Sequence, residues 1–237
     1  MRTTEHVKGA ARNSADTAFL ALRDLIVDGK LAPGSWIVES DLTSVLEVSR
    51  TPIRSALQWL QHEGYVVARG TGAKTRMMVA PLTLNDAREL YGIVGRIEGL
   101  AGRLSASLPA KPRAELVATL RKLNSEMSKT AKSPHPEDGQ FVSTDTMFHD
   151  MIVEACSGRR LLAIYKAIKP QTDRYWRLYP STGAEDMKDS CHEHEAIIEA
   201  VAKGDGDATE RALQINWEKG AERLAKAIMR FGERGNW

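Results

Sequence analysis

The sequence predicts a mainly α-helical protein with two domains, and three observations lead to this prediction. The chain has 237 residues, more than one average core requires, and 42% of them are hydrophobic, which excludes a wholly disordered chain. Apolar residues recur at helical spacing along most of the chain, and strand-like stretches occur only near residues 65–80. Residues 81–83 have the composition of a linker. We therefore predict one domain over 1–80 and a second over 84–230.

Three short helices are predicted in the first domain, each from apolar residues that recur every three or four positions. The first spans 15–28 and the second about 39–46. The third spans about 50–63. It begins after Ser49, a residue type that caps helices, and has Pro52 in its first turn, where a missing N–H costs little.

Two short strands follow these helices. Residues 65–68 and 76–80 are rich in strand-forming residues, and a turn with two glycines at 70–72 separates them. Three short helices followed by a β-hairpin predict a winged helix-turn-helix.

The second domain is predicted to contain helices alone, because no strand-like alternation and no internal repeat occur in it. We expect the fourth of its helices to be kinked at Pro170. Such a pattern predicts an antiparallel all-α bundle. The expected helices are 84–107, 111–130, 141–156, 159–178, 187–202 and 206–230.

The charge of the chain is distributed unevenly. The net charge is +2, and residues 1–80 hold ten basic against eight acidic residues, whereas the rest is neutral with 23 of each. A local basic cluster suits a surface that contacts phosphates, although a solvated charged face is the alternative. Between 49 and 76 only Glu63 opposes the basic residues Arg50, Arg54, Arg69, Lys74 and Arg76.

The apolar stretches and the cysteine content indicate the cellular compartment of the protein. No stretch approaches the roughly 18 apolar residues of a membrane-spanning helix, and residues 1–30 lack the apolar core of a secretory signal. Cys156 and Cys191 allow one disulfide at most, and two free thiols fit a reducing environment better. We expect a cytoplasmic protein that does not bind a membrane.

The start of the third helix is the candidate for reading DNA, because this end of a recognition helix meets base edges. Arg50 and Arg54 are four residues apart and share one helix face, and arginine can bind the O6/N7 edge of guanine with two hydrogen bonds. Ser49 and Thr51 suit phosphate contacts. Glycine in the wing allows a close approach to the DNA backbone. The candidate DNA contacts are Ser49, Arg50, Thr51, Arg54, Gly72 and Lys74.

Several motifs between residues 15 and 80 carry a resemblance to a known family. They are Leu31-Ala32-Pro33-Gly34, Glu39-Ser40-Asp41-Leu42 and Val48-Ser49-Arg50-Thr51-Pro52-Ile53-Arg54-Ser55-Ala56-Leu57. The region resembles the GntR family of bacterial transcription regulators. The resemblance implies a homodimer on an inverted-repeat operator in double-stranded DNA, with Arg50, Thr51 and Arg54 as DNA contacts.

A candidate metal site lies in the second domain. Asp145 and His149 are spaced i,i+4, so that a carboxylate and an imidazole lie side by side on a helix. They could hold one divalent cation together with His194 from another helix. A surface ion pair is the alternative, but apolar neighbours such as Phe148 and Ile152 favour a pair that faces the interior.

Three motifs of this domain also resemble a known family. They are Glu98-Gly99-Leu100-Ala101, Asp145-Thr146-Met147-Phe148-His149 and Glu193-His194-Glu195-Ala196-Ile197. Over residues 84–230 the chain resembles the FCD ligand-binding domain, the C-terminal partner of this DNA-binding module in FadR-type regulators. The chain departs from the family at Val94, where an arginine is expected, and at Asn216, where the third metal-binding histidine is expected.

The asparagine at this position leaves three outcomes open, because an amide is a poorer ligand than imidazole for zinc or nickel. The site is weakened, or a harder metal uses the Asn216 oxygen, or no metal binds and the effector is hydrogen-bonded directly. Our hypothesis is a weakened or exchangeable divalent site for Zn, Ni or Mn, with Asp145, His149, His194 and Asn216 as candidate ligands.

The expected effector is a small organic acid, since a bound cation and nearby histidines attract a carboxylate. Arg96, close to the place of the expected family arginine, and Arg174 on a later helix are candidate effector contacts.

We therefore predict a transcription regulator without enzymatic activity. The acid would change operator affinity by shifting the placement of the DNA-binding modules, with ligand-relieved repression as the expected arrangement. One alternative is a metal-dependent hydrolase built on Asp145, His149 and His194, which would leave residues 15–80 without a purpose. The other is a DNA-binding protein with a vestigial effector pocket.

Overall fold

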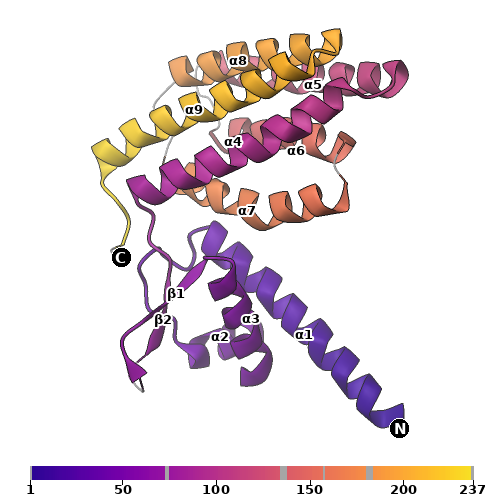
Figure 1. Cartoon of the computed structure of the whole chain (residues 1–237). Helices are drawn as coiled ribbons and strands as arrows, with labels where there is room; N and C mark the ends of the chain where they lie inside the picture. Colours follow the sequence, from indigo (N-terminus) through magenta and orange to yellow (C-terminus); the bar gives the residue numbers. More distant parts are fainter. Residues whose placement is uncertain (1, 73–74, 134–137, 157, 180–183, 236–237) are drawn as a thin grey trace. The chain divides into compact units, whose positions relative to one another are not determined.

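The computed structural model describes residues 2–72, 75–133, 138–156, 158–179 and 184–235 (Figure 1). The chain divides into two units. The first contains the residues up to Thr83 and those from Glu233 on, and the second spans Leu84–Gly232. Among the described residues the only sheet is a two-stranded one, and all other regular elements are helices, so the predicted mainly α class is confirmed.

The first unit is a winged helix-turn-helix, as predicted. Its core is formed by side chains from α1, α3 and the two strands, among which Leu22, Ile26, Ile53, Leu60 and Val79 are fully buried. The strands β1 and β2 are antiparallel and pair from Val66 opposite Val79 to Arg69 opposite Arg76. The elements are α1 Arg2–Val27, α2 Glu39–Leu46, α3 Arg50–His62, β1 Val66–Arg69 and β2 Arg76–Val79.

Helix α1 is longer than the predicted helix at 15–28, because it begins at Arg2. A hydrophobic period reveals a helix only over the turns in which one face of the helix is buried. That face follows the spacing of Ala15, Ala18, Leu22 and Ile26, all of which are buried in the structure. Residues 2–14 carry no such stripe in the sequence, so the pattern contains no signal for the first turns.

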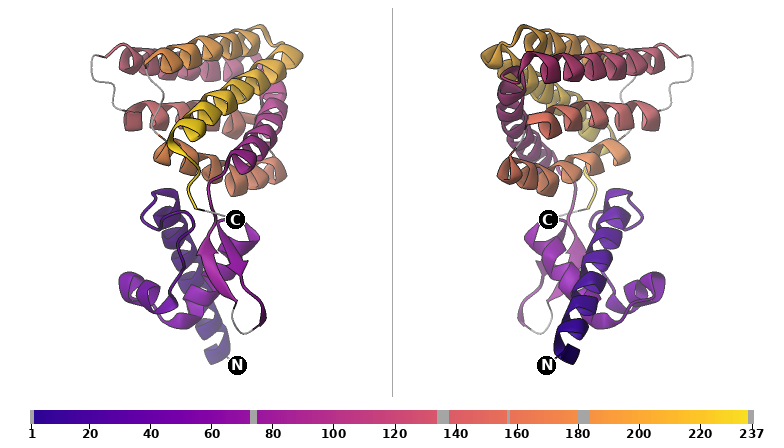
Figure 2. Two further views of the ribbon diagram at one scale, coloured as in Figure 1. Left: turned by 90° about the vertical axis from the view of Figure 1, so that its left-hand side faces the viewer. Right: turned by 90° about the vertical axis from the view of Figure 1, so that its right-hand side faces the viewer.

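The second unit is a bundle of helices, and no strand occurs among its described residues. Helix α9 runs beside both α4 and α8, and α5 packs on α6 and α8 (Figures 1 and 2). Helix α7 continues through Pro170. The helix ends agree with the prediction to within three residues. The elements are α4 Leu84–Ala106, α5 Ala110–Ala131, α6 Asp138–Cys156, α7 Arg159–Leu178, α8 Ala184–Lys203 and α9 Gly206–Phe231.

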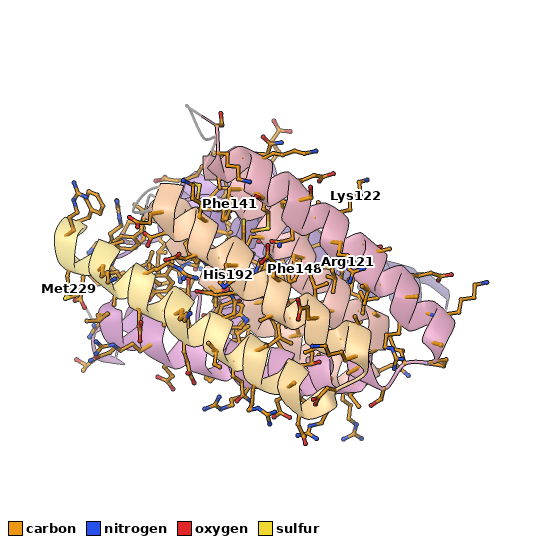
Figure 3. All side chains as sticks on the ribbon, turned by 90° about the horizontal axis from the view of Figure 1, so that it is seen from above. Arg121, Lys122, Phe141, Phe148, His192 and Met229 are labelled. Carbon is orange, nitrogen blue, oxygen red and sulfur yellow. The ribbon has the colours of Figure 1, made fainter. Side chains whose placement is uncertain are left out.

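One core of this bundle is apolar and includes the fully buried side chains Leu120, Phe148, Ile152 and Leu213 from α5, α6 and α9. Figure 3 shows Phe148 between the helices, whereas Met229 projects from α9 and is 68% exposed. No helix in the described part of the chain is long and apolar enough to cross a membrane.

Small residues let α4 and α9 approach closely. Gly95, Gly99 and Gly102 recur on the face of α4 that meets α9, and a Cβ added at Gly95 would lie 2.9 Å from the Cβ of Trp217. Because that atom is attached directly to the backbone, it cannot move without displacing α9 or the indole ring. Gly92 lies on the exposed face of the same helix, and a Cβ there would meet nothing within 4 Å.

These two glycines predict opposite responses to alanine. We expect Gly92→Ala to raise the free energy of unfolding by about 0.5–1 kcal/mol, because alanine is the better helix former. We expect Gly95→Ala to lower it by about 1–3 kcal/mol, because overpacking at Trp217 outweighs the same gain. Urea unfolding measures both. Equal stability of the two variants would contradict the close approach of α4 and α9.

Candidate DNA-binding surface and metal-ligating cavity

The start of α3 presents polar side chains to solvent, because Ile53, Ala56 and Leu57 bury the opposite face in the core. Arg50, Thr51 and Arg54 are exposed. Ser49 occupies the N-cap position, but its side chain makes no capping hydrogen bond. The candidate contacts on α3 therefore form one outward-facing polar surface.

The two arginines of this surface differ in their surroundings. Arg54 Nε donates a hydrogen bond of 2.8 Å to Glu39 Oε2 on α2, which leaves its two terminal nitrogens as donors. Glu39 therefore orients Arg54 while the side chain remains 63% exposed. For Arg50 the structure shows an exposed side chain on the same helix face.

The hairpin adds a second basic feature, formed by two arginines of the basic cluster noted in the sequence. Arg69 and Arg76 lie directly opposite each other on β1 and β2, and Arg76 also stacks on the Trp36 ring at 4.9 Å. Like charges opposite each other destabilise a hairpin, so an anion such as a phosphate would relieve this repulsion. Gly72 is exposed in the turn with a φ of +57°. Lys74, the other predicted wing contact, is outside the described residues.

In the second unit, the structure brings together three of the four predicted ligand residues. Asp145 and His149 are one turn apart on α6, His194 comes from α8, and their ligand atoms all lie within 4.8 Å of one another. His194 Nε2 is 3.5 Å from Asp145 Oδ1. His194 is fully buried, and neither of its ring nitrogens has a hydrogen-bond partner among the described residues. An unsatisfied buried imidazole is costly, so a bound group that uses it would be stabilised.

Glu98 of α4 contacts His149 of this cluster and is fully buried. His149 Nδ1 is 2.5 Å from Glu98 Oε2, which also accepts a hydrogen bond of 2.7 Å from Trp217 Nε1. Tyr165 Oη lies 3.2 Å from Glu98 Oε1 and 2.8 Å from Asp150 Oδ1, and its single O–H suits the shorter hydrogen bond to Asp150. Because Glu98 engages Nδ1 of His149, Nε2 is the nitrogen that remains for the cluster.

Burial and neighbouring charges shift the pKa values of the cluster. Burial, with the positive charges of His149 and Arg223, lowers the pKa of His194 well below its usual value, so its ring is neutral. For His149, burial lowers the pKa, but the Glu98 and Asp145 carboxylates outweigh it and the net pKa is raised. Burial raises the pKa of Asp145, against the charges of His149 and Lys169. Only the shift of His194 favours the form that coordinates a cation, since the raised pKa values of His149 and Asp145 favour protons that a bound cation would displace.

Asn216 of α9 forms part of a second polar group. Its Nδ2 donates to Glu193 Oε2 at 2.8 Å, and Arg223 donates to both carboxylate oxygens of Glu193, at 2.8 and 3.1 Å. Asn216 and Glu193 are both buried. The amide is thus held in one orientation.

A cavity of about 50 Å³ connects these groups. One water occupies roughly 10–15 Å³ on this measure, so the cavity suits a small molecule. Asp145, His149, Asn216 and Arg223 line it, as does Phe141 (Figure 3). The rest of the wall is largely apolar, and its aromatic side chains are Tyr91, Trp176, Tyr179 and Trp217.

Comparison with known proteins assigns both units. The gntR family of bacterial regulatory proteins matches residues 14–74, and the FCD domain matches residues 89–218. The chain belongs to the GntR family. It combines a GntR helix-turn-helix with an FCD domain, as the motifs indicated.

Relatives of this GntR protein are transcriptional regulators, and the chain is a regulator of this kind. It is 26% identical to the uncharacterised regulator YdhC of Bacillus subtilis, over 87% of this chain and 89% of that protein. It is 30% identical to a regulator in the TAR-I ttuE-ttuC' intergenic region of Agrobacterium vitis, over 65% of this chain and 86% of that one. A third relative is the gluconate operon repressor of Bacillus licheniformis, at 27% identity over 83% and 79% of the two chains. These relatives favour the regulator over the hydrolase alternative.

Solved structures share the fold of the GntR protein. McbR/YncC of E. coli superimposes with a TM-score of 0.68 at 18% identity, over 90% of this chain and 97% of that one. A GntR regulator from Rhodococcus sp. RHA1 has a TM-score of 0.64 at 20% identity, over 90% and 98%.

The two arginines expected to contact an effector do not line the cavity. Arg96 is 64% exposed and lies 3.8 Å from Glu218, because it is two residues from Glu98, about 200° around the helix. Arg174 is buried elsewhere on α7, where its charge acts on Asp86, the acceptor of a 2.6 Å hydrogen bond from Tyr175 Oη. The arginine that lines the cavity is Arg223. The sequence contains no motif that distinguishes it from other helical arginines.

FCD domains often bind metal ions, and the residues of this GntR protein fit a divalent cation. Asp145 offers a carboxylate oxygen, and His149 and His194 offer imidazole nitrogens at metal-site spacing. The His194 ring supports this fit, because a structural histidine would be hydrogen-bonded and neither ring nitrogen has a partner among the residues that the structure describes. Cys191 is buried close by in the sequence, and burial raises its pKa to about 11, so its thiol is a poor ligand.

Proposed function

We propose that this GntR regulator senses a small carboxylate bound in the FCD cavity, and that Asp145, His149 and His194 hold a divalent cation that takes part in binding. The observation that carries the proposal is the cluster of Asp145, His149 and His194 beside a largely apolar cavity, because the ring nitrogens of His194 have no hydrogen-bond partner in the described part of the chain. When bound, the ion supplies the positive charge that a ligand carboxylate requires.

The charges of the cavity support a role for the cation. Asp145 and Asp186 contribute carboxylates to the lining, and Arg223 is its arginine, but Glu193 already neutralises that guanidinium. His149, the other basic group of the lining, is paired with Glu98, so the described lining by itself offers an anion no unpaired positive charge. A divalent cation at Asp145 reverses this balance, which makes carboxylate binding dependent on the metal.

The names of relatives suggest a first class of carboxylates to test. The chain resembles gluconate operon repressors of two Bacillus species and a probable D-xylose utilization operon repressor. A sugar acid carries one carboxylate and several hydroxyl groups, which suit a small cavity with amide, guanidinium and tyrosine groups on its wall. We propose sugar acids and related hydroxy acids as the effector class.

The DNA-binding part of the proposal follows from the surface of α3. A homodimer would place two copies of α3 on the half-sites of an inverted repeat, with Arg50 and Arg54 on base edges and Ser49 and Thr51 on phosphates. The arginines of the wing and Lys74 would contact the flanking backbone. Effector binding would lower operator affinity and so relieve repression.

A thermal-shift experiment tests the effector proposal. Protein treated with a chelator is mixed with gluconate and other small carboxylates, with and without Mn²⁺ or Zn²⁺. We expect stabilisation by the acid only with metal, about 2.7 kcal/mol at a ligand concentration of 100 times Kd, and none in Asp145→Ala.

His192→Ala is the matched control, because His192 is 87% exposed on α8 and only two residues from His194. It should respond like the unaltered protein. Equal stabilisation by carboxylates after chelation would contradict the role of the metal, and no stabilisation by any acid would favour a vestigial pocket.

A further inference from the structure

The side chain of Asn216 has one polar atom that the network around Glu193 does not use. We infer that this atom, the amide oxygen Oδ1, is the fourth protein donor to the divalent cation, and that Glu193 and Arg223 orient it. The inference rests on the proposed function, since it concerns the same cation. It assigns this chain an oxygen donor where the FCD resemblance places a histidine.

The surroundings of the amide determine its orientation. Asn216 is 5% exposed and faces Glu193, whose two oxygens accept hydrogen bonds from both terminal nitrogens of Arg223. A carboxylate paired in this way with a guanidinium can only accept hydrogen bonds. The group of Asn216 that meets it at 2.8 Å must therefore be the NH₂. The oxygen is left as the acceptor of the amide.

The position of Asn216 makes this oxygen available to the cation site. Asn216 lines the same cavity as Asp145 and His149. The donor set then consists of two oxygens, from Asp145 and Asn216, and two nitrogens, from His149 and His194. Imidazole favours zinc and nickel, whereas carboxylate and carbonyl oxygens favour manganese. Exchange of one nitrogen for an oxygen therefore moves the preference of the site from zinc towards manganese.

Glu193 would orient a histidine in the same place equally well. Histidine ligands usually donate their second ring N–H to a carboxylate, and Glu193 already accepts an N–H from residue 216. Glu193, paired with Arg223, is therefore already placed to accept the second ring N–H of a histidine ligand at position 216. The single change Asn216→His should convert the site to three nitrogens and one oxygen.

Metal affinities of the full-length chain test this inference. Apoprotein is titrated with Mn²⁺ and with Zn²⁺ against a fluorescent chelator, and circular dichroism confirms that each variant is folded. We expect Asn216→His to raise the ratio of zinc to manganese affinity by at least about tenfold, because it adds an imidazole. We expect Asn216→Ala to weaken manganese binding, because an oxygen ligand is removed. We expect Glu193→Gln to weaken manganese binding by about 10–100-fold, because the Asn216 amide is no longer held in its orientation.

Lys219→Ala is the matched control, because Lys219 lies 3.7 Å from Glu193 Oε1 but is 54% exposed and does not hold the amide. It should leave both affinities unchanged. An unchanged affinity ratio in Asn216→His, or manganese binding by Asn216→Ala equal to that of the unaltered chain, overturns the inference.

Asp145→Ala separates this inference from the proposed function. If it abolishes metal binding while the Asn216 variants behave like the unaltered chain, the metal site stands and only the role of Asn216 is wrong. If the unaltered chain binds neither ion, both the metal part of the proposed function and this inference are overturned.

Discussion

Replacement of Glu98 by alanine is expected to lower the free energy of unfolding by about 3–5 kcal/mol. His149 Nδ1 and Trp217 Nε1 both use Glu98 Oε2, and both groups are buried. Each loses its partner in the variant, at about 1–3 kcal/mol per group, and a cavity remains. Tyr165 loses less, because its hydroxyl keeps the hydrogen bond to Asp150. The loss of these bonds outweighs the gain from removing a buried carboxylate.

Urea unfolding of the intact chain measures this effect. Glu89→Ala is the control, because Glu89 is an exposed acid on the same helix and its replacement should change stability by less than about 0.5 kcal/mol. Glu98→Gln should fall between the two, since it keeps one acceptor oxygen but turns an NH₂ towards buried donors. A loss below about 1 kcal/mol in Glu98→Ala would mean that His149 and Trp217 find other partners.

The double variant Arg50→Ala/Arg54→Ala is expected to lower operator affinity by at least about 30-fold. A bidentate arginine–guanine contact contributes about 1–3 kcal/mol, and the two side chains share the exposed face of α3. Arg54 is held by Glu39, so Glu39→Gln should weaken binding by less than Arg54→Ala. DNase footprinting and fluorescence anisotropy at several salt concentrations measure the affinity.

The wing provides a contrast to these base contacts. Arg69→Ala should weaken binding to operator and unrelated DNA alike and reduce the salt slope by about one, as expected for a phosphate contact. Arg121→Ala removes the same charge from α5, in the second unit, and serves as the control.

Unchanged discrimination between operator and unrelated DNA in the Arg50→Ala/Arg54→Ala variant would show that α3 does not read bases.

Local spacing predicted most of the fold and part of the candidate site. The hydrophobic period placed the bundle helices closely, and the i,i+4 spacing of Asp145 and His149 placed both on one face of α6. Arg96 was a candidate because it is two residues from Val94, where the family has an arginine, but Val94 is buried whereas Arg96 is 64% exposed on another face of α4. An arginine two positions away on a helix lies on a different face, so it cannot make the contacts of the arginine that the family has.

A signal for Glu98 was present but was not used. Glu98 follows the helical period of the buried residues Val94, Ala101 and Ser105, and a charged residue at a core position requires partners. No comparable signal exists for Arg223 or for the orientation of Asn216, because both depend on Glu193, on a different helix. Such contacts form only when α8 and α9 pack together.

The sequence by itself determined the family, the two kinds of module, the helix positions and the residues that can act as ligands. These properties depend on residue type and on spacing within one element, both of which the sequence contains directly. Only the tertiary structure decided that His194 has no hydrogen-bond partner among the described residues, that Glu98 holds His149, and that the NH₂ of Asn216 faces Glu193. Each of these depends on which helices pack together, since the cost of burying a polar group is set by the partners that a neighbouring helix supplies.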